Sequence, residues 1–298
     1  MCPFVEKFLT KGKFFGMNLK KIFALMTAVV LTAAIFTGCG EEKKAEAPSN
    51  DFKIGMLRHM NASEKDFNGL LKTVSDTFGL KMSTYDPVFF DNLGSMQMAL
   101  ESGKINAFST YKCVADYIVA NNPNMEIADD DTLEFIDAFC LALRSDDKEL
   151  IEMSNKAVRE MRDDGTLDKF IKDYITAAKN EEKIPAIEIK NIPNAKTVKV
   201  AVTGDLPPLD YVDSEGNAAG FNTAVLSELS RRIGRNIELV QVDSGARAAA
   251  LTSGRVDISF WAIVPVSEII PQNADRPDGV ELTTPYYRGK IVHVKMKK

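Results

Sequence analysis

The chain has 298 residues, enough for two lobes with cores of ordinary size, and a formal net charge of −5 at pH 7. Hydrophobic residues make up 45% of it and charged residues 27%, as in soluble globular proteins. The acidic balance argues against a nucleic-acid partner, which needs a basic face, and the two histidines are too few for a histidine-based metal site. We therefore expect no nucleic acid, no metal and no cofactor.

An export signal is predicted within residues 1–38. Residues 17–21 are basic, residues 22–36 are uncharged and apolar, and small residues precede Cys39. This pattern is typical of a bacterial lipoprotein signal that starts at Met17, with Cys39 as the lipidated first residue of the mature protein; an uncleaved anchor is the alternative. Residues 39–50 then form a charged tether. Without residues 1–38, 32 basic residues face 41 acidic ones, a net charge of −9.

Residues 51–133 predict an α/β lobe. Its helices are expected from a cap at Asn61 to Gly79 and at residues 93–102 and 111–120. Its strands are expected at residues 52–57, 88–90 and 105–109. Cys113 in this lobe and Cys140 beyond it lie in apolar contexts, which favours buried free thiols over a disulfide.

Residues 134–178 predict one strand and two helices, and a linker follows. The strand covers residues 137–144, an amphipathic helix covers residues 147–161, and a last helix covers residues 167–175. Residues 179–195 are charged and punctuated by prolines, which is typical of a linker.

Residues 196–298 predict a second α/β lobe. Residues 197–202 are β-branched and apolar, which indicates a buried strand, and two prolines at 207–208 end it by removing ladder donors. Turn residues at 213–217 precede a helix at residues 221–233 that Gly234 closes. The remaining elements are strands at residues 237–242 and 256–261, a helix at residues 244–252, and an extended pair at residues 282–283 and 291–294.

Two segments of the chain resemble each other. Residues 89–118 and residues 240–269 both run strand, Asp, short helix, Ser-Gly-basic-hydrophobic, strand. A fold with two similar α/β lobes would give such a repeat. The alternative is that helix, Ser-Gly, strand is common punctuation in α/β proteins.

The start of the second lobe resembles the bacterial extracellular solute-binding proteins, family 3, of polar amino-acid importers. The resemblance rests on Pro-Pro-Leu-Asp-Tyr at residues 207–211 and Gly-Asn-Ala-Ala-Gly-Phe-Asn at residues 216–222, with Leu209 and Asn222 in place of the usual Phe and Asp. It implies a two-lobed α/β fold of the type 2 periplasmic-binding kind, with a hinge. It also implies capture of a small solute for an ABC permease, without catalytic residues.

The parts stand in an unusual order for that family. Its closing signature is found at residues 141–147 and 164–169, before the lobe-1 opening instead of after it. We therefore expect a circular permutation, in which residues 51–133 form lobe 2 and residues 134–178 with 196–298 form lobe 1. Permutation is tolerated where the natural termini lie close together at the surface. Two truncated modules in tandem are the alternative.

Ligand-binding residues are expected beyond the carboxyl ends of the strands and at helix N-termini. Trp261 and Arg247 also have structural alternatives, a core tryptophan and a solvated helix-face arginine. The family's carboxylate-binding Arg is replaced by Ile269, and its ammonium-binding Asp by Tyr111, so an ordinary α-amino acid is in doubt as the ligand. The expected set is Asp205, Leu206, Ser244, Arg247, Trp261 and Ala262 in lobe 1, and Arg58, Asn61, Ser63 and Tyr111 in lobe 2.

The sequence thus predicts a monomeric, lipid-anchored, extracytoplasmic solute-binding protein. One alternative is a sensor or docking module on the same fold. Another is a dehydratase-like enzyme, for which Asp205, Asp210 and Asp243 offer acid and base groups.

Overall fold

The computed structural model describes residues 52–60, 69, 73, 76–77, 86–128, 135–180, 182, 184–266, 272–273 and 275–297. Residues 49–298 form one compact unit. The predicted signal, Cys39, the tether, and most of the helix expected before Gly79 lie outside the described residues. No helix in the described part of the chain is long and apolar enough to cross a membrane.

The first sheet region is parallel, with β1 between β2 and β3. β1 pairs with both neighbours, and Ile54 of β1 aligns with Pro87 of β2 and with Ala107 of β3. Helices α3 and α4 follow β2 and β3, as predicted, although β3 lies two residues later than expected. The elements are β1 (Lys53–Leu57), β2 (Asp86–Phe90), α3 (Leu93–Glu101), β3 (Ala107–Tyr111), α4 (Lys112–Asn121) and β4 (Met125–Ile127).

The second sheet region repeats this arrangement, with β6 (Thr197–Val202) between β10 (Asn236–Gln241) and β11 (Ile258–Pro265). These three strands are parallel in the order β10-β6-β11, matching β2-β1-β3 of the first region. The two segments that resemble each other in sequence therefore occupy equivalent places in the two regions. The other elements here are β7 (Asp205–Leu206), β8 (Asp210–Val212), β9 (Ala218–Ala219), α8 (Phe221–Ile233), the 3-10 turn Ser244–Ala246, α9 (Arg247–Thr252) and β12 (Val280–Leu282).

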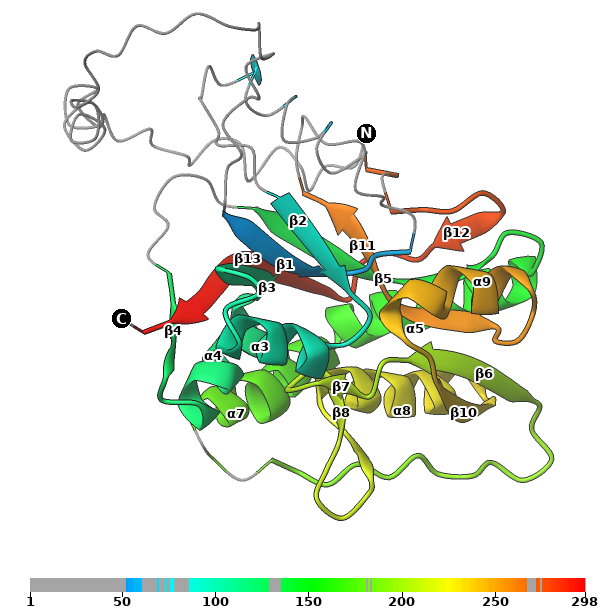
Figure 1. Ribbon diagram of the computed structural model, residues 1–298. Helices are drawn as coiled ribbons and strands as arrows, with labels where there is room; N and C mark the ends of the chain where they lie inside the picture. The colour runs from blue at the N-terminus through cyan, green and yellow to red at the C-terminus, as the bar shows by residue number, and fades with distance from the viewer. Residues whose placement is uncertain are drawn as a thin grey trace, which may run out of the picture. The chain divides into compact units, whose positions relative to one another are not determined.

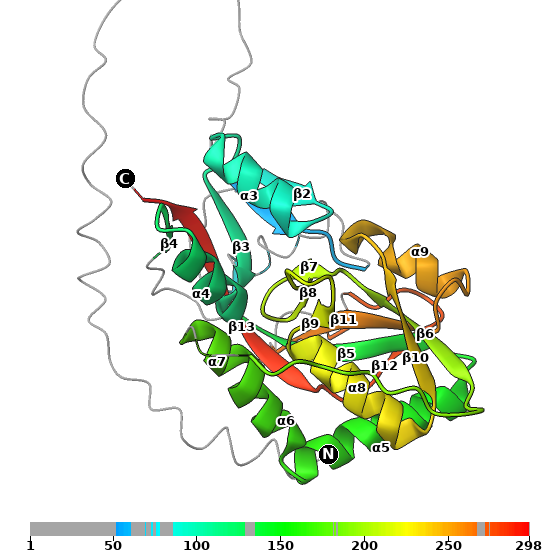
Figure 2. The same cartoon turned by 90° about the horizontal axis from the view of Figure 1, so that it is seen from below.

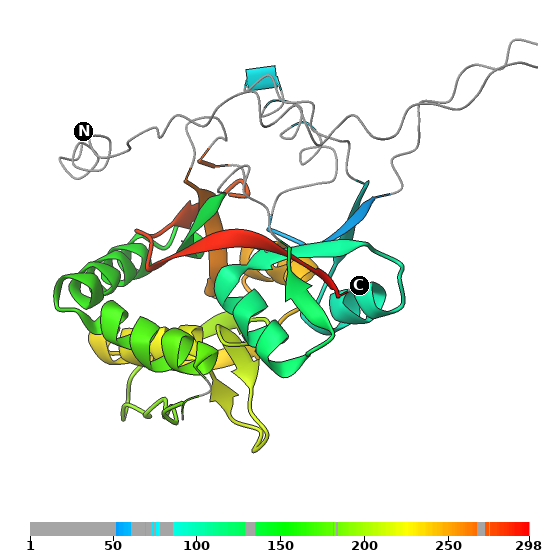
Figure 3. The ribbon, with the colours of Figure 1, turned by 90° about the vertical axis from the view of Figure 1, so that its left-hand side faces the viewer.

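One long strand, β13 (Tyr287–Met296), joins the two sheet regions. Its first residues pair with β5 (Ile136–Arg144), where Tyr287 aligns with Phe139. Its later residues pair with β3 and β4, where Ile291 aligns with Tyr111. Figures 1 and 3 show this red strand passing from one region to the other. A single strand thus links both halves at the point where they meet.

The segment before the linker packs on the second sheet region. β5 pairs antiparallel with β11 and with β12. Helix α5 (Lys148–Asp163) lies against α8, and Figure 2 shows α5, α6 and α8 together below the sheet. The last predicted helix is longer than expected: α6 (Thr166–Phe170) continues through a π-helical turn and α7 as far as Lys179. Its apolar face, with Tyr174 and Ala178 buried, carries it past the predicted end at residue 175.

The Pro-rich loop and helix α8 are locked together through backbone hydrogen bonds. The N–H groups of Phe221 and Asn222, the first residues of α8, donate to the carbonyls of Pro208 (2.9 Å) and Leu209 (2.7 Å). Gly220 stands between them with φ +102°, and a Cβ there would lie 2.4 Å from the Leu209 carbonyl oxygen. The first turn of a helix needs such acceptors, which explains why the Pro-Pro and Gly-Phe motifs occur together.

The core combines apolar residues from both sheet regions and from the covering helices. Phe108 and Phe139 are fully buried on the two sides of the region junction. Cys113 and Cys140 are buried free thiols, as predicted, and burial raises their pKa values to about 11 and about 12.

Candidate ligand-binding site at the junction of the two sheet regions

The structure brings predicted site residues from both regions into one cluster. Tyr111 ends β3 of the first region, and Trp261 lies in β11 of the second; their ring centroids are 5.8 Å apart in an edge-on arrangement. Arg247 begins α9 and holds its guanidinium carbon 4.7 Å from the Trp261 ring centroid. We call His59, Tyr111, Asp137, Arg247 and Trp261 the central cluster.

A β-bulge in β11 gives Trp261 its place. The register of β11 against β5 shifts between Ser259 and Ala262, and Trp261 has φ +60°, which is uncommon for a bulky residue. Arg247 donates to the carbonyl oxygens of Phe260 (2.9 Å) and Trp261 (2.7 Å) that the bulge leaves outside the ladder. The strained backbone and the buried arginine therefore stabilise each other.

Nearly all the N–H donors of Arg247 form hydrogen bonds with backbone carbonyl oxygens. Besides the two bulge carbonyls it donates to the carbonyl oxygens of Ser244 (3.3 Å) and, across the junction, Arg58 (3.5 Å). A guanidinium has five N–H donors, so four are engaged. The side chain is 0% exposed, and burial lowers its pKa, opposed first by the charge of Asp275. A bidentate grip on a solute carboxylate would require Arg247 to release one of these bonds.

Asp137 is the carboxylate of the central cluster. It is 6% exposed and accepts a hydrogen bond of 3.0 Å from the Tyr111 hydroxyl. Burial raises the pKa of Asp137, while the nearby His59 and the Tyr111 hydroxyl pull it back down. The pKa of Tyr111 is raised well above its ordinary value, first by burial and then by the charge of Asp137. The Tyr111 side chain is therefore a neutral phenol, and the Asp137 side chain is a poorly solvated carboxyl group.

Three other predicted residues lie where the regions touch at the rim of this cluster. The Asp205 carboxylate accepts a hydrogen bond of 2.7 Å from the N–H of Leu93, at the start of α3. The N–H of Ser244 donates to the carbonyl of Asp91 (3.0 Å), and Arg58 forms an ion pair of 3.0 Å with the Asp91 carboxylate. These contacts hold the two regions together in the arrangement seen here.

The remaining predicted positions divide into buried and undescribed ones. Leu206 and Ala262 are buried in the apolar core beside Asp205 and Trp261. Asn61 and Ser63 lie outside the described residues. Asp137 was not among the predicted binding residues, because in the sequence it is only the polar first residue of an apolar strand.

Asp210 serves the structure of the Pro-rich loop. It is buried and accepts hydrogen bonds from the Thr203 hydroxyl, the Gly204 N–H and the Asn222 amide. Burial raises its pKa and these donors lower it. Because the Asp210 carboxylate already accepts these three hydrogen bonds, it holds the loop against α8. This structural role does not favour Asp210 as a catalytic acid or base.

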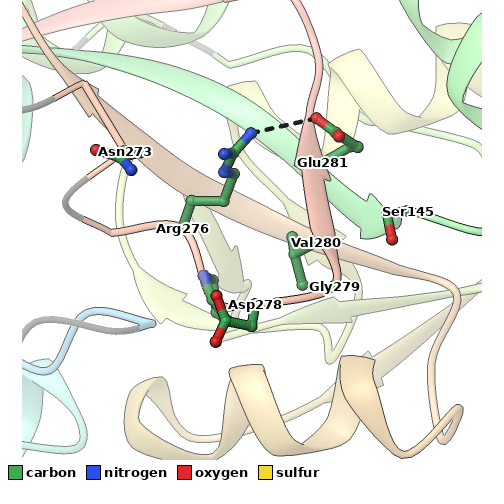
Figure 4. A pocket seen from close by; sticks show the side chains of 8 residues that line it. Ser145, Asn273, Arg276, Asp278, Gly279, Val280 and Glu281 are labelled. Atoms are coloured by element: carbon green, nitrogen blue, oxygen red, sulfur yellow. Dashed lines mark hydrogen bonds and ion pairs between the residues drawn. The ribbon is translucent and has the colours of Figure 1, made fainter.

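Two surface hollows lie away from the central cluster. One, of about 200 Å³, is formed by the turn around residues 276–281 together with Ser145 and Asn273. Figure 4 shows its Arg276 turned toward Glu281, with which it forms an ion pair of 3.3 Å. The other, of about 280 Å³, lies between α4, α7 and the start of β13. The residues predicted to bind ligand line neither.

Comparison with known proteins finds a match for the second sheet region. Residues 198–298 match the model of the bacterial extracellular solute-binding proteins, family 3. A probable histidine-binding protein of Campylobacter jejuni is 27% identical over 101 residues, which cover 34% of this chain and 36% of that protein. The chain thus spans about a third of the length of the curated relative it matches.

The solved structures that this chain matches are only distantly similar to it. A ligand-binding component of an ABC-type import system from Staphylococcus aureus is 13% identical, with a TM-score of 0.39, over 82% of this chain and 65% of that one. A nutrient-binding protein from Burkholderia cenocepacia bound to methionine is 12% identical, with a TM-score of 0.37, over 82% and 84%. Residues 198–298 are thus similar to the bacterial extracellular solute-binding proteins, family 3.

Proposed function

We propose that this protein binds a small polar solute, such as an amino acid, at the junction of its two sheet regions. The observation that carries the proposal is the central cluster, in which predicted ligand-binding residues of both regions, Tyr111 and Trp261, meet. The family of residues 198–298 and the histidine-binding relative support the same role. The protein binds its solute without changing it.

The proposed mechanism is closure of the two regions about β13. Contacts such as Asp205 with the Leu93 N–H close the junction without a solute, but they are few and lie at its rim. A solute that touches both regions adds free energy to the closed state alone and so shifts the population toward it. Opening of the rim contacts admits the solute to the buried cluster.

We further propose that the protein is extracytoplasmic, anchored through a lipid on Cys39, and that it acts as a monomer that delivers its solute to an ABC permease. The signal pattern of residues 1–38 and the small residues before Cys39 support the anchor. The acidic mature chain fits a secreted binding protein without a nucleic-acid partner.

The order of the parts supports a circular permutation of one two-lobed unit. β5, which lies before the linker, pairs with β11, which lies after it, and α5 packs against α8. Residues 134–178 therefore complete the sheet and core of residues 196–298. Two separate truncated modules would not share strands in this way. We propose residues 51–133 as lobe 2, and residues 179–195 as the linker between the ordinary termini.

A thermal-shift screen of the purified full chain tests the proposal. The panel contains histidine, other amino acids, short peptides, aromatic acids and sugars. Because a ligand that binds only the folded state raises its Tm by mass action, we expect a saturable rise with one class of solute, and its loss in Trp261→Ala. Flat curves from a cooperatively folded sample would overturn the proposal and favour a docking module. Conversion of the bound solute, followed by NMR, would instead favour an enzyme.

A further inference from the structure

The larger surface hollow, between α4, α7 and the start of β13, is rich in basic side chains. Its volume is about 280 Å³, and we call it the basic hollow. Figure 2 shows α4 and α7 next to the start of β13. The hollow is lined by four basic residues and one acidic residue, which are Lys112, Lys179, Arg288, Lys290 and Asp116. None of the central-cluster residues lines it, so it is a separate place on the molecule.

The positive charges of the basic hollow exceed the negative charge. Lys112 forms an ion pair of 2.6 Å with Asp116, and Lys290 has an interaction of its own. Lys179 and Arg288 are exposed, and neither forms an ion pair or a side-chain hydrogen bond with any residue that the structure describes. Two cations of a chain with a formal net charge of −5 thus line one hollow without a described counter-ion.

The wall of the basic hollow opposite α4 contains an unusual helical turn. Residues Ile171–Thr176 form the π-helical turn between α6 and α7, and Thr176 lines the hollow. Such turns frequently occur at functional sites. The hydroxyls of Thr223 and Thr252 donate to the carbonyl four residues earlier, at 2.9 Å in both cases. The Thr176 hydroxyl forms no such bond with a described residue, so it is available as a donor to a ligand.

The start of α4 adds positive potential to the same place. Lys112 and Cys113 are the first two residues of α4 and line the hollow. The first turn of α4 has no acidic residue, and its N-cap residue Tyr111 forms no side-chain cap. The N–H groups at the start of a helix carry partial positive charge. This charge has the same sign as Lys179 and Arg288 and therefore reinforces them.

We propose that the basic hollow binds a small dianion, such as inorganic phosphate or a phosphate monoester, through Lys179 and Arg288. Two negative charges balance the two cations, whereas a monocarboxylate balances only one. Guanidinium and ammonium groups are the usual side-chain donors to phosphate in proteins. The volume is slightly below the range of about 300–1,000 Å³ typical of drug-sized ligands, which suits a small ion. Because α4 belongs to the first sheet region and α6 and α7 pack with the second, the anion contacts both regions.

Calorimetric titration of the wild-type full chain with inorganic phosphate tests the site. Sodium chloride holds the ionic strength constant, so that a saturable heat does not arise from general screening. Sulfate and glycerol 3-phosphate are further dianions, and acetate is the monoanion control. We expect the dianions to bind at one site per chain, and acetate to bind at least about tenfold more weakly. Absence of saturable binding by every dianion, or equal affinity for acetate, would overturn the proposal.

Substitutions at exposed positions test the two cations without disturbing the core. We expect Arg288→Gln and Lys179→Gln each to weaken phosphate binding by about 3- to 10-fold. The matched controls Arg159→Gln and Lys172→Gln, at exposed helix positions outside the hollow, should keep the wild-type affinity. Equal weakening in the controls would attribute binding to overall charge and overturn the site. Binding to phosphatidylglycerol vesicles without binding of free phosphate would indicate a membrane-binding surface and overturn the dianion.

Discussion

Replacing Arg247 with Met should destabilise the protein far more than an ordinary arginine substitution. Arg247 is fully buried and donates to the Phe260 and Trp261 carbonyls at 2.9 and 2.7 Å, and Met removes both donors while keeping much of the volume. Each buried carbonyl left without a donor costs about 1–3 kcal/mol. The stack on Trp261 contributes about 0.5–2 kcal/mol more.

One term opposes this loss. Removing a buried charge relieves its desolvation, the same burial that lowers the pKa of Arg247. We therefore expect a net loss of about 2–5 kcal/mol in the free energy of unfolding. For a unit of this size, each kcal/mol corresponds to roughly 2–4 °C, so Tm should fall by about 4–20 °C.

Urea unfolding followed by tryptophan fluorescence measures this loss. Trp261 is the chain's only tryptophan, so its emission reports on the junction itself. The control is Arg255→Met, at an exposed position in the turn after α9, which should change stability by about 0.5 kcal/mol or less. An Arg247→Met protein within about 1 kcal/mol of wild type would refute the role assigned to the bulge and its arginine.

Other predictions concern the loop, the buried acid and the thiols. Gly220→Ala should cost about 2–4 kcal/mol, because its Cβ would lie 2.4 Å from a backbone oxygen, whereas Gly216→Ala, also at positive φ but in open space, should cost about 1 kcal/mol; equal costs would contradict the clash. Asp137→Asn should raise Tm or leave it unchanged without solute. Because burial raises the pKa of Asp137, its carboxyl group binds a proton more tightly in the native state than in the unfolded chain. The stability that this protonation contributes is present at acid pH and is lost as the pH rises through the folded-state pKa of Asp137. Wild type should therefore lose stability over that rise relative to the variant in melts between pH 3 and 8, and parallel curves would contradict this. Cys113 and Cys140, with pKa values raised to about 11 and about 12, should be alkylated only in denaturant, as mapped by mass spectrometry; rapid native labelling would contradict their burial.

Local signals were sufficient for much of the fold. The apolar run at residues 197–202 and the glycine at 234 place β6 and the end of α8 correctly, because strand and helix-end preferences are set by neighbouring residues. The repeat between residues 89–118 and 240–269 predicted two similar α/β lobes, and the two sheet regions do share one strand order.

Long-range geometry is what the sequence could not supply. The residues around Trp261 carry no sequence signal for a bulge with positive φ. The hydrogen bonds from Arg247 to the backbone carbonyls of that bulge were therefore not predicted. Asp137 gave no signal because its burial depends on strands from distant parts of the chain, β11 and β13. The helix that ends at Lys179 passed its predicted end because tertiary packing decides such boundaries more than propensity does.

The most direct test of the account is whether one solute needs both sheet regions. The solute with the largest thermal shift is titrated calorimetrically into wild type and into two variants, Tyr111→Ala from the first region and Trp261→Ala from the second. The account predicts that each variant, folded by circular dichroism, loses at least about tenfold in affinity, since each removes an aromatic contact from the same buried place. Wild-type affinity in either variant would contradict binding at the junction.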